Sequence, residues 1–383
     1  MKWEKVKLGN VCEITSSKRI FYSEYVDDGV PFYRSKEIIE SDEGKVIENP
    51  LYISVDKYNE IKEKFGVPQT GDMLLTSVGT IGIPYIIKKK DCFYFKDGNL
   101  TWFRDFREGL NSKYLYYWIK SSEGTGILYN TTIGSSQKAL TISALKNIKV
   151  SLPPRSVQDK IVEVVSAYDD LIENNQRQIK LLEEAAQRLY KEWFVDLRFP
   201  GHENTKIVDG VPEGWSRTNI NEILTFHRGY DLTKNEMKAG RYPVVGSTTV
   251  IGYHNEFKIK GPGIVTGRSG SLGKYQFIWD NFWPHNTSLY ISDYKDHNIF
   301  FVYSLLQTVD FASLNNGGAI PTLNRNVLSN IEVIEPTDEL QEMFAKIAEP
   351  QYQKIKNLEK QNNQLKMARD ALLPKLMSGE VEV

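Results

Sequence analysis

An internal duplication constrains the fold more than any other feature, because the chain of 383 residues carries one pattern twice. Each half opens with a tryptophan-led polar segment, at Trp3 and at Trp215. Each half then continues through a glycine pair, an aromatic segment, a polar loop and a short β-branched run to a proline, Pro153 or Pro336. From residue 134 onward, the spacing between the copies is constant. A duplication this regular predicts two similar domains related by pseudo-symmetry.

Each copy is predicted to be a mixed α+β domain, because β-branched and aromatic runs alternate with Gly, Asn and Asp turns. Residues 83–87 and 263–266 are typical of strands. Pro84 cannot donate a ladder hydrogen bond, so it should begin a strand or lie on a sheet edge. The glycine pairs, at 79 and 82 and at 270 and 273, are predicted to form tight turns.

A long helix is predicted after each proline. Residues 156–194 contain neither Pro nor Gly, and their apolar positions alternate four and three apart, which is the period of a coiled coil. The second copy repeats this register from Phe344 to Leu376, although Pro350 lies within it. Proline removes a helical hydrogen bond, so a kink or a break is expected near Glu349.

The two helices are predicted to pair antiparallel, so that the numbers of facing residues add up to 537. This register places Asn175 opposite Asn362 and Trp193 opposite Phe344. A buried polar pair fixes register at some cost in stability. The alternatives are a slip of one heptad, or packing of each helix on its own domain. The central seam is predicted to contain Ile172, Asn175, Ile179, Leu182, Ile355, Leu358, Asn362 and Leu365.

Composition narrows the class of protein. Apolar residues make up 40% and charged residues 25%, which is ordinary for a globular chain. No stretch approaches eighteen apolar residues and no signal peptide is evident, so neither a membrane span nor secretion is expected. The two cysteines, Cys12 and Cys92, argue against a disulfide framework and predict a cytoplasmic protein. The net charge of −1 is not that of a simple nucleic-acid binder, so a partner should neutralise much of any DNA backbone.

Motifs for catalysis are incomplete, so no catalytic residue, metal site or cofactor is expected in this chain. Residues 49–52 depart from the Asn-Pro-Pro-Tyr motif of adenine methyltransferases because Leu51 replaces its second proline. Residues 267–274 depart from a phosphate-binding loop, since Arg268 occupies a required glycine position and Tyr275 that of the Ser or Thr. The five histidines show no spacing suited to zinc.

Several motifs resemble those of one family. Their order and duplication over nearly the whole chain make the resemblance to type I restriction-modification DNA specificity subunits specific. The family's first conserved helix is resembled by three motifs: Pro153 and Pro154 followed by Gln158, residues 168–175 (YDDLIENN) and residues 188–196 (RLYKEWFVD). The end of its second conserved helix is resembled by residues 372–380 (LLPKLMSGE). The openings of its target-recognition domains are resembled by residues 3–8, 31–34 and 212–215.

The resemblance implies a non-catalytic DNA-reading subunit. Each target-recognition domain would read one half of an interrupted DNA sequence in the major groove, and the helices would set the spacer and dock two methyltransferase subunits. Restriction subunits could join them. Adenine methylation, ATP-driven translocation and cleavage would belong to these partners, together with S-adenosylmethionine, ATP and magnesium. The alternative is a coiled-coil scaffold that binds proteins without sequence-specific DNA binding.

The repeat, the heptad patterns and the polar, aperiodic segment between the copies divide the chain, and the resemblance names the parts. The predicted division is target-recognition domain 1 at residues 1–154, the first central helix at 155–197, a linker at 198–213, target-recognition domain 2 at 214–336, the second conserved helix at 337–378 and a tail at 379–383.

Base reading requires polar side chains on loops that reach the groove edges. The competing interpretation of every candidate is a solvated loop residue. The candidates are Lys18, Arg19, Arg34, Lys36, Ser77, Thr80 and Lys138 in the first half, and Arg228, Tyr230, Arg268, Ser269, Ser271, Asn324 and Arg325 in the second.

Overall fold

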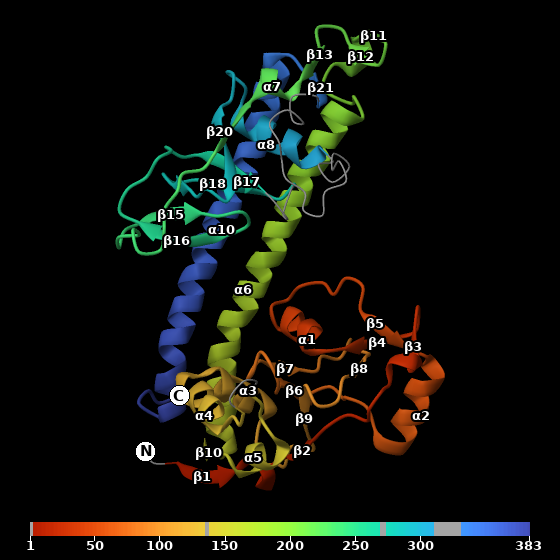
Figure 1. Ribbon diagram of the computed structural model, residues 1–383, viewed down its shortest axis with the longest axis vertical. Helices are drawn as coiled ribbons and strands as arrows, with labels where there is room; N and C mark the ends of the chain where they lie inside the picture. The colour runs from red at the N-terminus through yellow and green to blue at the C-terminus, as the bar shows by residue number, and fades with distance from the viewer. Residues whose placement is uncertain (1–2, 135–137, 269–272, 310–330) are drawn as a thin grey trace. The chain divides into compact units, whose positions relative to one another are not determined.

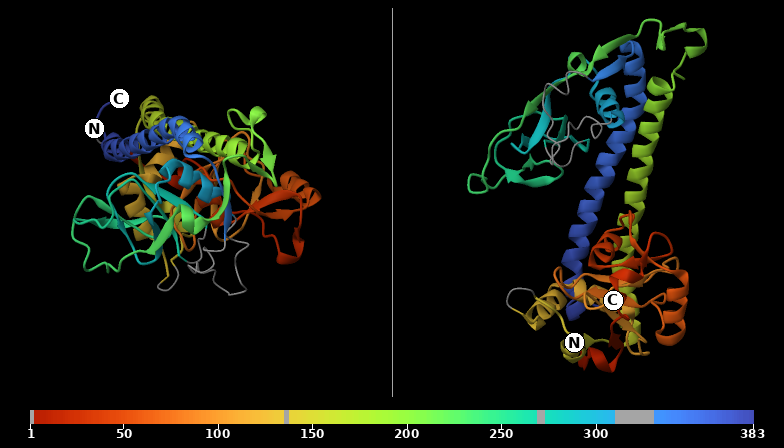
Figure 2. Two further views of the ribbon diagram at one scale, coloured as in Figure 1. Left: turned by 90° about the horizontal axis from the view of Figure 1, so that it is seen from above. Right: turned by 45° about the vertical axis from the view of Figure 1, so that its right-hand side comes forward.

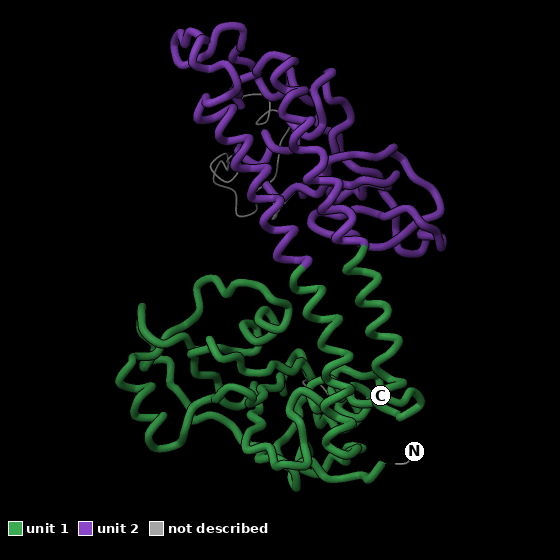
Figure 3. Tube along the Cα trace, turned by 180° about the vertical axis from the view of Figure 1, so that it is seen from behind, with its two compact units in different colours: residues 1–174, 361–383 green, residues 175–360 purple. Residues whose placement is uncertain are grey.

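The computed structural model describes residues 3–134, 138–268, 273–309 and 331–383 (Figure 1). The chain divides into two compact units, which Figure 3 distinguishes by colour. Unit 1 comprises residues 1–174 and 361–383, and unit 2 comprises residues 175–360. Each unit therefore contains one mixed domain together with a part of both long helices.

Two four-stranded sheets form the domain of unit 1. The first has the order β2 (Glu13–Thr15), β9 (Leu100–Arg104), β6 (Met73–Thr76) and β7 (Pro84–Ile86), and the second the order β3 (Tyr25–Val26), β5 (Leu51–Ile53), β4 (Val30–Tyr33) and β8 (Tyr94–Phe95). β1 (Glu4–Lys7) pairs with β10 (Lys149–Leu152). The helices are α1 (Ser35–Asp42), α2 (Val55–Phe65), α3 (Ser112–Lys120), α4 (Ser122–Thr131) and α5 (Ile142–Asn147).

The domain of unit 2 has a four-stranded and a three-stranded sheet. The first has the order β14 (Thr225–Arg228), β20 (Ser288–Asp293), β17 (Gly263–Gly267) and β18 (Tyr275–Ile278), and the second the order β16 (Val250–His254), β15 (Tyr242–Val245) and β19 (Trp283–Pro284). β13 (Ser216–Asn219) pairs with β21 (Glu332–Glu335), and β11 (Ile207–Val208) with β12 (Val211–Pro212). The described part of this domain also contains α7 (Ile220–Ile223) and α8 (Ile299–Thr308).

The two domains share one topology, which confirms the predicted repeat. The order β2-β9-β6-β7 in unit 1 corresponds to β14-β20-β17-β18 in unit 2. Each second sheet ends in a parallel pair, β4 with β8 and β15 with β19. An asparagine caps each equivalent helix, because Asn111 accepts a backbone hydrogen bond at the start of α3 and Asn298 at the start of α8.

The local predictions for turns and edges agree with the structure. Pro84 is the first residue of β7, and β7 is an edge strand. Gly79 and Gly82 have φ of +78° and +86° in the turn between β6 and β7, where glycine adopts such angles without strain. Gly273 has φ of +79°, while Gly270 lies outside the described residues.

Both predicted long helices are present. α6 spans Arg155–Tyr190 and continues as a π-helical turn over Lys191–Val195, and α10 spans Asp338–Ser378. Of the kink or break expected near Glu349, the break is wrong, because α10 continues through Pro350, and the kink stays a prediction. Proline within a helix costs about 3 kcal/mol. Ala348 and Tyr352 are both buried in the core of unit 2, and their packing offsets this cost.

Within each unit the two helices pack against each other in antiparallel order. In unit 2 the rings of Trp193 and Phe344 lie 6.3 Å apart, as the predicted register requires. Further along, burial and then the nearby carboxylate of Glu359 raise the pKa of Glu183. In unit 1, Arg369 of α10 donates to Asp169 of α6, and Val165 of α6 packs in one cluster with Leu376 of α10. Asn175 and Asn362 are both buried. They belong to different units, and their pairing remains a prediction.

The long helices form part of both hydrophobic cores. In unit 1, Val165 of α6 and Leu376 of α10 pack in one cluster with Trp118 of α3. In unit 2, Figure 2 shows α8 against α10, where the rings of Phe300 and Tyr352 stack 5.6 Å apart. The helices thus anchor each mixed domain from within its own unit.

Candidate nucleic-acid interface

Three loops gather at the same place in the topology of both domains. They follow β2 or β14, follow β6 or β17, and precede the central strand β9 or β20. In unit 1, the amide of Ser77 donates to the Asn99 carbonyl at 2.8 Å, and in unit 2 the amide of Arg268 donates to the Thr287 carbonyl at 3.2 Å. We call these sites the loop edges: residues 16–19, 77–80 and 97–99 in unit 1, and residues 228–231, 268 and 285–287 in unit 2.

At the loop edge of unit 1, contacts of neighbouring residues fix the backbone of Lys18 and Arg19. The amide of Lys18 donates to the hydroxyl of the buried Tyr94 at 2.7 Å, and the side chain of Ile20 is buried. Arg19 Nε donates to Asp97 at 2.9 Å, yet the arginine side chain is 69% exposed. The structure therefore fixes the backbone of this pair of cations while leaving Arg19 open to solvent.

Thr80 and Lys138 come close to the same edge, whereas Ser77 lies inside the fold. Thr80 is exposed in the turn after β6. Ala139, next to Lys138, bridges to Val78, and this connection joins the two segments. Ser77 is only 2% exposed, and its hydroxyl lies 2.7 Å from that of Thr101. Because its hydroxyl is engaged within the sheet, Ser77 is a turn-stabilising residue and not part of the exposed surface.

Arg34 and Lys36 are bound to carboxylates of α1. Arg34 donates to Glu37 at 2.6 Å, and Lys36 lies 3.7 Å from Glu40. Burial disfavours the charged form of Glu37, but the hydrogen bonds from Arg34 outweigh it and hold the pKa of that carboxyl below its usual range. The positive charge of Arg34 is thus largely balanced within its own helix.

At the loop edge of unit 2, the backbone of Gly229 lies close to the backbone of His285. A Cβ atom there would lie 2.0 Å from the His285 carbonyl oxygen, so no larger residue fits without movement. The next amide, of Tyr230, donates to the Pro284 carbonyl at 2.8 Å. The Tyr230 hydroxyl lies 2.9 Å from that of Tyr290, and burial raises the pKa of Tyr290. This approach sets the positions of Arg228 and Tyr230.

Three further polar residues at these edges were absent from the sequence-based candidates. Asp97 binds Arg19 in unit 1. In unit 2, Asp231 accepts a hydrogen bond from Asn286 and lies 3.9 Å from Arg228. Of these three residues, only Asp97 could have been found from the sequence, because it lies in a polar turn between two apolar strands. Four sequence-based candidates, Ser269, Ser271, Asn324 and Arg325, lie outside the described residues.

Comparison with known proteins identifies the family. The model of the type I restriction-modification DNA specificity domain matches residues 1–184 and 212–367, which include the repeated domain of each unit. The chain belongs to the family of type I restriction-modification DNA specificity subunits. This assignment does not favour the alternative of a protein-binding scaffold.

Relatives support the family assignment along the whole chain. The MjaIX specificity subunit of Methanocaldococcus jannaschii is 27% identical over an alignment of 422 positions, which covers 100% of this chain and 94% of the relative. A putative specificity subunit of Haemophilus influenzae, S.HindORF215P, is 28% identical over 49% of this chain and 45% of its own length. The crystal structure of an S subunit from M. genitalium has the same fold, with a TM-score of 0.60 at 18% identity over 98% of this chain and 96% of that one.

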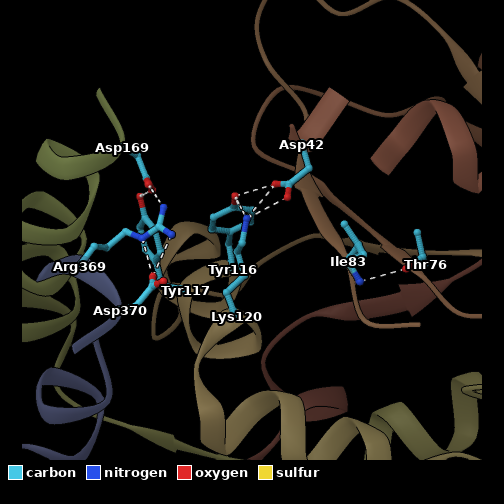
Figure 4. Close-up of polar contacts among 9 residues, drawn as sticks. All are labelled: Asp42, Thr76, Ile83, Tyr116, Tyr117, Lys120, Asp169, Arg369 and Asp370. Atoms are coloured by element: carbon cyan, nitrogen blue, oxygen red, sulfur yellow. Dashed lines mark hydrogen bonds and ion pairs between the residues drawn. The ribbon is translucent and has the colours of Figure 1, made fainter. Parts of the chain in front are cut away.

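In this specificity subunit, polar contacts join the domain of unit 1 to the helices of the same unit (Figure 4). The Tyr117 hydroxyl of α3 donates to Asp169 of α6 at 2.8 Å, and Arg369 of α10 donates to the same carboxylate. Beside it, the Tyr116 hydroxyl donates to Asp42 of α1 at 2.7 Å. These contacts restrict the orientation of the domain relative to the helix segments of unit 1.

A buried glutamine near the start of each long helix hydrogen-bonds to backbone groups that precede the helix. The Gln158 amide donates to the carbonyls of Gly109 at 2.7 Å and Pro153 at 2.8 Å, and its oxygen accepts from the Asn111 amide at 2.9 Å. Gln341, at the equivalent position of the second copy, donates to the Pro336 carbonyl at 3.1 Å. Gln158 therefore connects the start of α6 to the segment that begins α3.

The described residues contain neither a cluster of metal ligands nor a membrane-spanning helix. Among residues 3–134, 138–268, 273–309 and 331–383, no three His, Cys, Asp or Glu side chains gather as they would around a metal ion. No helix in these ranges combines the length and apolar character required to cross a bilayer. Cys12 and Cys92 are both free thiols.

Proposed function

We propose that this specificity subunit reads a bipartite DNA site, with the loop edge of each repeated domain contacting one half-site in the major groove. The observation that carries the proposal is the occurrence of the same three-loop edge in both domains, each with exposed hydrogen-bond donors. Arg19, Lys18 and Thr80 provide them in unit 1, and Arg228 in unit 2, where the half-buried Asn286 lies beside it. Arginine and asparagine are side chains that distinguish guanine and adenine in the major groove.

The balance of charge supports base reading more than general attraction to the DNA backbone. Arg19 and Arg228 each lie near an aspartate, and the whole chain has a net charge of −1. Affinity for DNA depends strongly on the number of phosphates that cations neutralise. The proposal therefore assigns much of the backbone binding to the partner subunits and the choice of sequence to this chain.

The long helices are proposed to form an antiparallel coiled coil that sets the spacer and docks two methyltransferase subunits, which restriction subunits can join. Burial of the seam residues Ile172, Ile355 and Leu358 supports this arrangement, as does the antiparallel packing of α6 and α10 inside each unit. Half-sites read from one face of B-DNA would lie about 34–36 Å apart, with the intervening bases unread.

Chemistry is proposed to reside in the partners, in the cytoplasm where host DNA lies. S-adenosylmethionine would serve the methyltransferase subunits, and ATP and magnesium the restriction subunits. Under this proposal the chain is non-catalytic. Its two reading domains are residues 1–154 and 214–336, and its two spacer helices are residues 155–197 and 337–378.

The test is the methylation pattern produced by the complex. The chain would be expressed with its methyltransferase subunits in a host that lacks adenine methylation, and methylated adenines would be mapped by single-molecule sequencing. The expected motif has two defined half-sites separated by a fixed number of unspecified bases. An uninterrupted motif, methylation by this chain alone, or the same methylation without this chain would contradict the proposal.

Binding measurements test the scaffold alternative. Fluorescence anisotropy would compare duplexes with and without the mapped motif, using the chain alone and the chain with its methyltransferase subunits. A preference for the motif is expected with the complex. Equal affinity for both duplexes in both conditions would support a scaffold and reject a reading function.

A further inference from the structure

We infer that Arg19 recognises a guanine in the half-site read by unit 1, and that Asp97 is the positioning residue that orients its guanidinium. This inference rests on the proposed function and names one base contact within it. The feature behind it is an exposed arginine that is held both along its backbone and through its Nε atom.

The backbone of Arg19 is held on both sides. The preceding amide, of Lys18, donates to the Tyr94 hydroxyl at 2.7 Å, and Tyr94 is only 1% exposed. The following residue, Ile20, packs in the buried cluster that contains Phe32 and Tyr94. The Cα position of Arg19 is therefore set by the core of unit 1 and not by solvent. Contacts on rigid supports lose less entropy when a ligand binds.

The side chain of Arg19 is oriented by a carboxylate. Its Nε donates to Asp97 Oδ2 at 2.9 Å, and the aspartate side chain is 18% exposed, compared with 69% for the arginine. An arginine bound through Nε retains its two terminal nitrogens as a planar fork. That fork matches the O6 and N7 acceptors of guanine, which is the commonest specific contact in the major groove.

Asp97 also explains why the contact favours a base over a phosphate. A carboxylate 2.9 Å from the guanidinium offsets its charge and repels the DNA backbone. A base edge carries no net charge, so a hydrogen-bonding fork is retained there while the attraction to phosphate falls. The neighbouring Lys18 is exposed, and its ammonium provides a separate point charge for the backbone.

The loop edge of unit 2 contains a related arrangement. Asp231 accepts a hydrogen bond from the side chain of Asn286 and lies 3.9 Å from a terminal nitrogen of Arg228. Both edges therefore place an aspartate beside an arginine, although Asp97 precedes β9 and is 18% exposed whereas Asp231 follows β14 and is 80% exposed.

The first experiment compares variants in the complex with the methyltransferase subunits. A plasmid library randomised within the mapped half-site would be methylated by wild type, Arg19→Lys and Asp97→Ala. Arg19→Lys keeps the charge and removes the fork, so the preference for guanine at one position should fall about tenfold or more. Asp97→Ala should weaken the preference at that same position. All other positions, and the whole second half-site, should be unchanged.

A matched control separates this effect from the loss of an ion pair. Arg155 donates through Nε to Asp159 at 2.8 Å, at the start of α6 in the same unit. Arg155→Lys changes the same type of contact outside the loop edge, and the motif should stay unaltered. Equal loss of guanine preference in Arg155→Lys and Arg19→Lys would overturn the inference.

A base analogue provides a readout that a merely structural role would not change. Substituting 7-deazaguanine at the affected position removes N7 from the DNA. This substitution should weaken binding of the wild-type complex in an anisotropy assay and have a smaller effect on Arg19→Lys, whose ammonium lacks the planar fork. An unaltered motif in Arg19→Lys, a wild-type half-site without guanine, or uniform loss of methylation at every sequence in a folded variant would each overturn the inference. A wild-type complex without any sequence preference would instead reject the proposed function.

Discussion

Gln158 should be among the most sensitive polar positions of unit 1. Its side chain is 0% exposed and makes three hydrogen bonds, to the Pro153 and Gly109 carbonyls and from the Asn111 amide. The substitution Gln158→Met keeps a similar volume and removes every one of these bonds. Three backbone groups then lose their partner at the junction between α3 and α6.

The expected cost follows from the burial of each bond. The bond to Pro153 is fully buried, and a buried group left unpaired costs about 1–3 kcal/mol. The bonds involving Gly109 and Asn111 are half-buried, so water can replace them in part, at about 0.5–1.5 kcal/mol each. The free energy of opening of unit 1 should therefore fall by about 2–6 kcal/mol.

Hydrogen exchange measured by mass spectrometry localises this effect on the full chain. Peptides from α3 and the start of α6 should exchange faster in Gln158→Met, while peptides of unit 2 keep their protection. Gln364, exposed on α10 in the same unit, is the matched control, and Gln364→Met should change stability by less than about 0.5 kcal/mol. If the two substitutions gave equal effects, or if Gln158→Met altered exchange by under about 1 kcal/mol, the reasoning from buried hydrogen bonds would be refuted.

Three further predictions concern the second half-site, a buried thiol and the helices. Gly229→Ala would place a Cβ 2.0 Å from the His285 carbonyl oxygen, so it should alter the second half-site in the methylation map and leave the first unchanged. Burial raises the pKa of the Cys12 thiol to about 12, so at pH 8 iodoacetamide should label the exposed Cys92 and spare Cys12 until the chain is denatured. The unfolded thiol ionises at lower pH than the folded one, so the stability of unit 1 should fall as the pH rises above about 9, and this loss should be smaller in Cys12→Ala. Removing seven residues from each of α6 and α10, about 10.5 Å of helix, should change the unread gap and preserve both half-sites; altered half-sites would reject the ruler.

Features that depend on short-range patterns could be predicted from the sequence. The 183-residue spacing between Pro153 and Pro336 recurs in the structure, where β10 and β21, and then α6 and α10, begin at equivalent positions. Helix and strand periodicity reflects contacts between near neighbours, and a duplicated pattern directs the same fold twice. Pro84 likewise marked an edge strand because a missing amide hydrogen has the same consequence in any sheet.

The candidate site could be predicted only in outline. Exposed cations such as Lys18 and Arg19 stand on loops in the sequence, but nothing local shows that Ser77 is buried against Thr101. The bond from Arg19 to Asp97 joins residues 78 positions apart, and that from Asn286 to Asp231 joins residues 55 apart. Such pairs form only when β-strands distant in the chain come together.

The sequence by itself determined that this protein has two similar mixed domains and two long helices, because repetition and periodicity are properties of neighbouring residues. Tertiary packing alone decided that α10 passes through Pro350, since the burial of Ala348 and Tyr352 outweighs the local cost of the proline. It also decided which loop side chains face solvent and which partner each one has. Those outcomes depend on long-range contacts that bring separate segments together, and no local pattern encodes them.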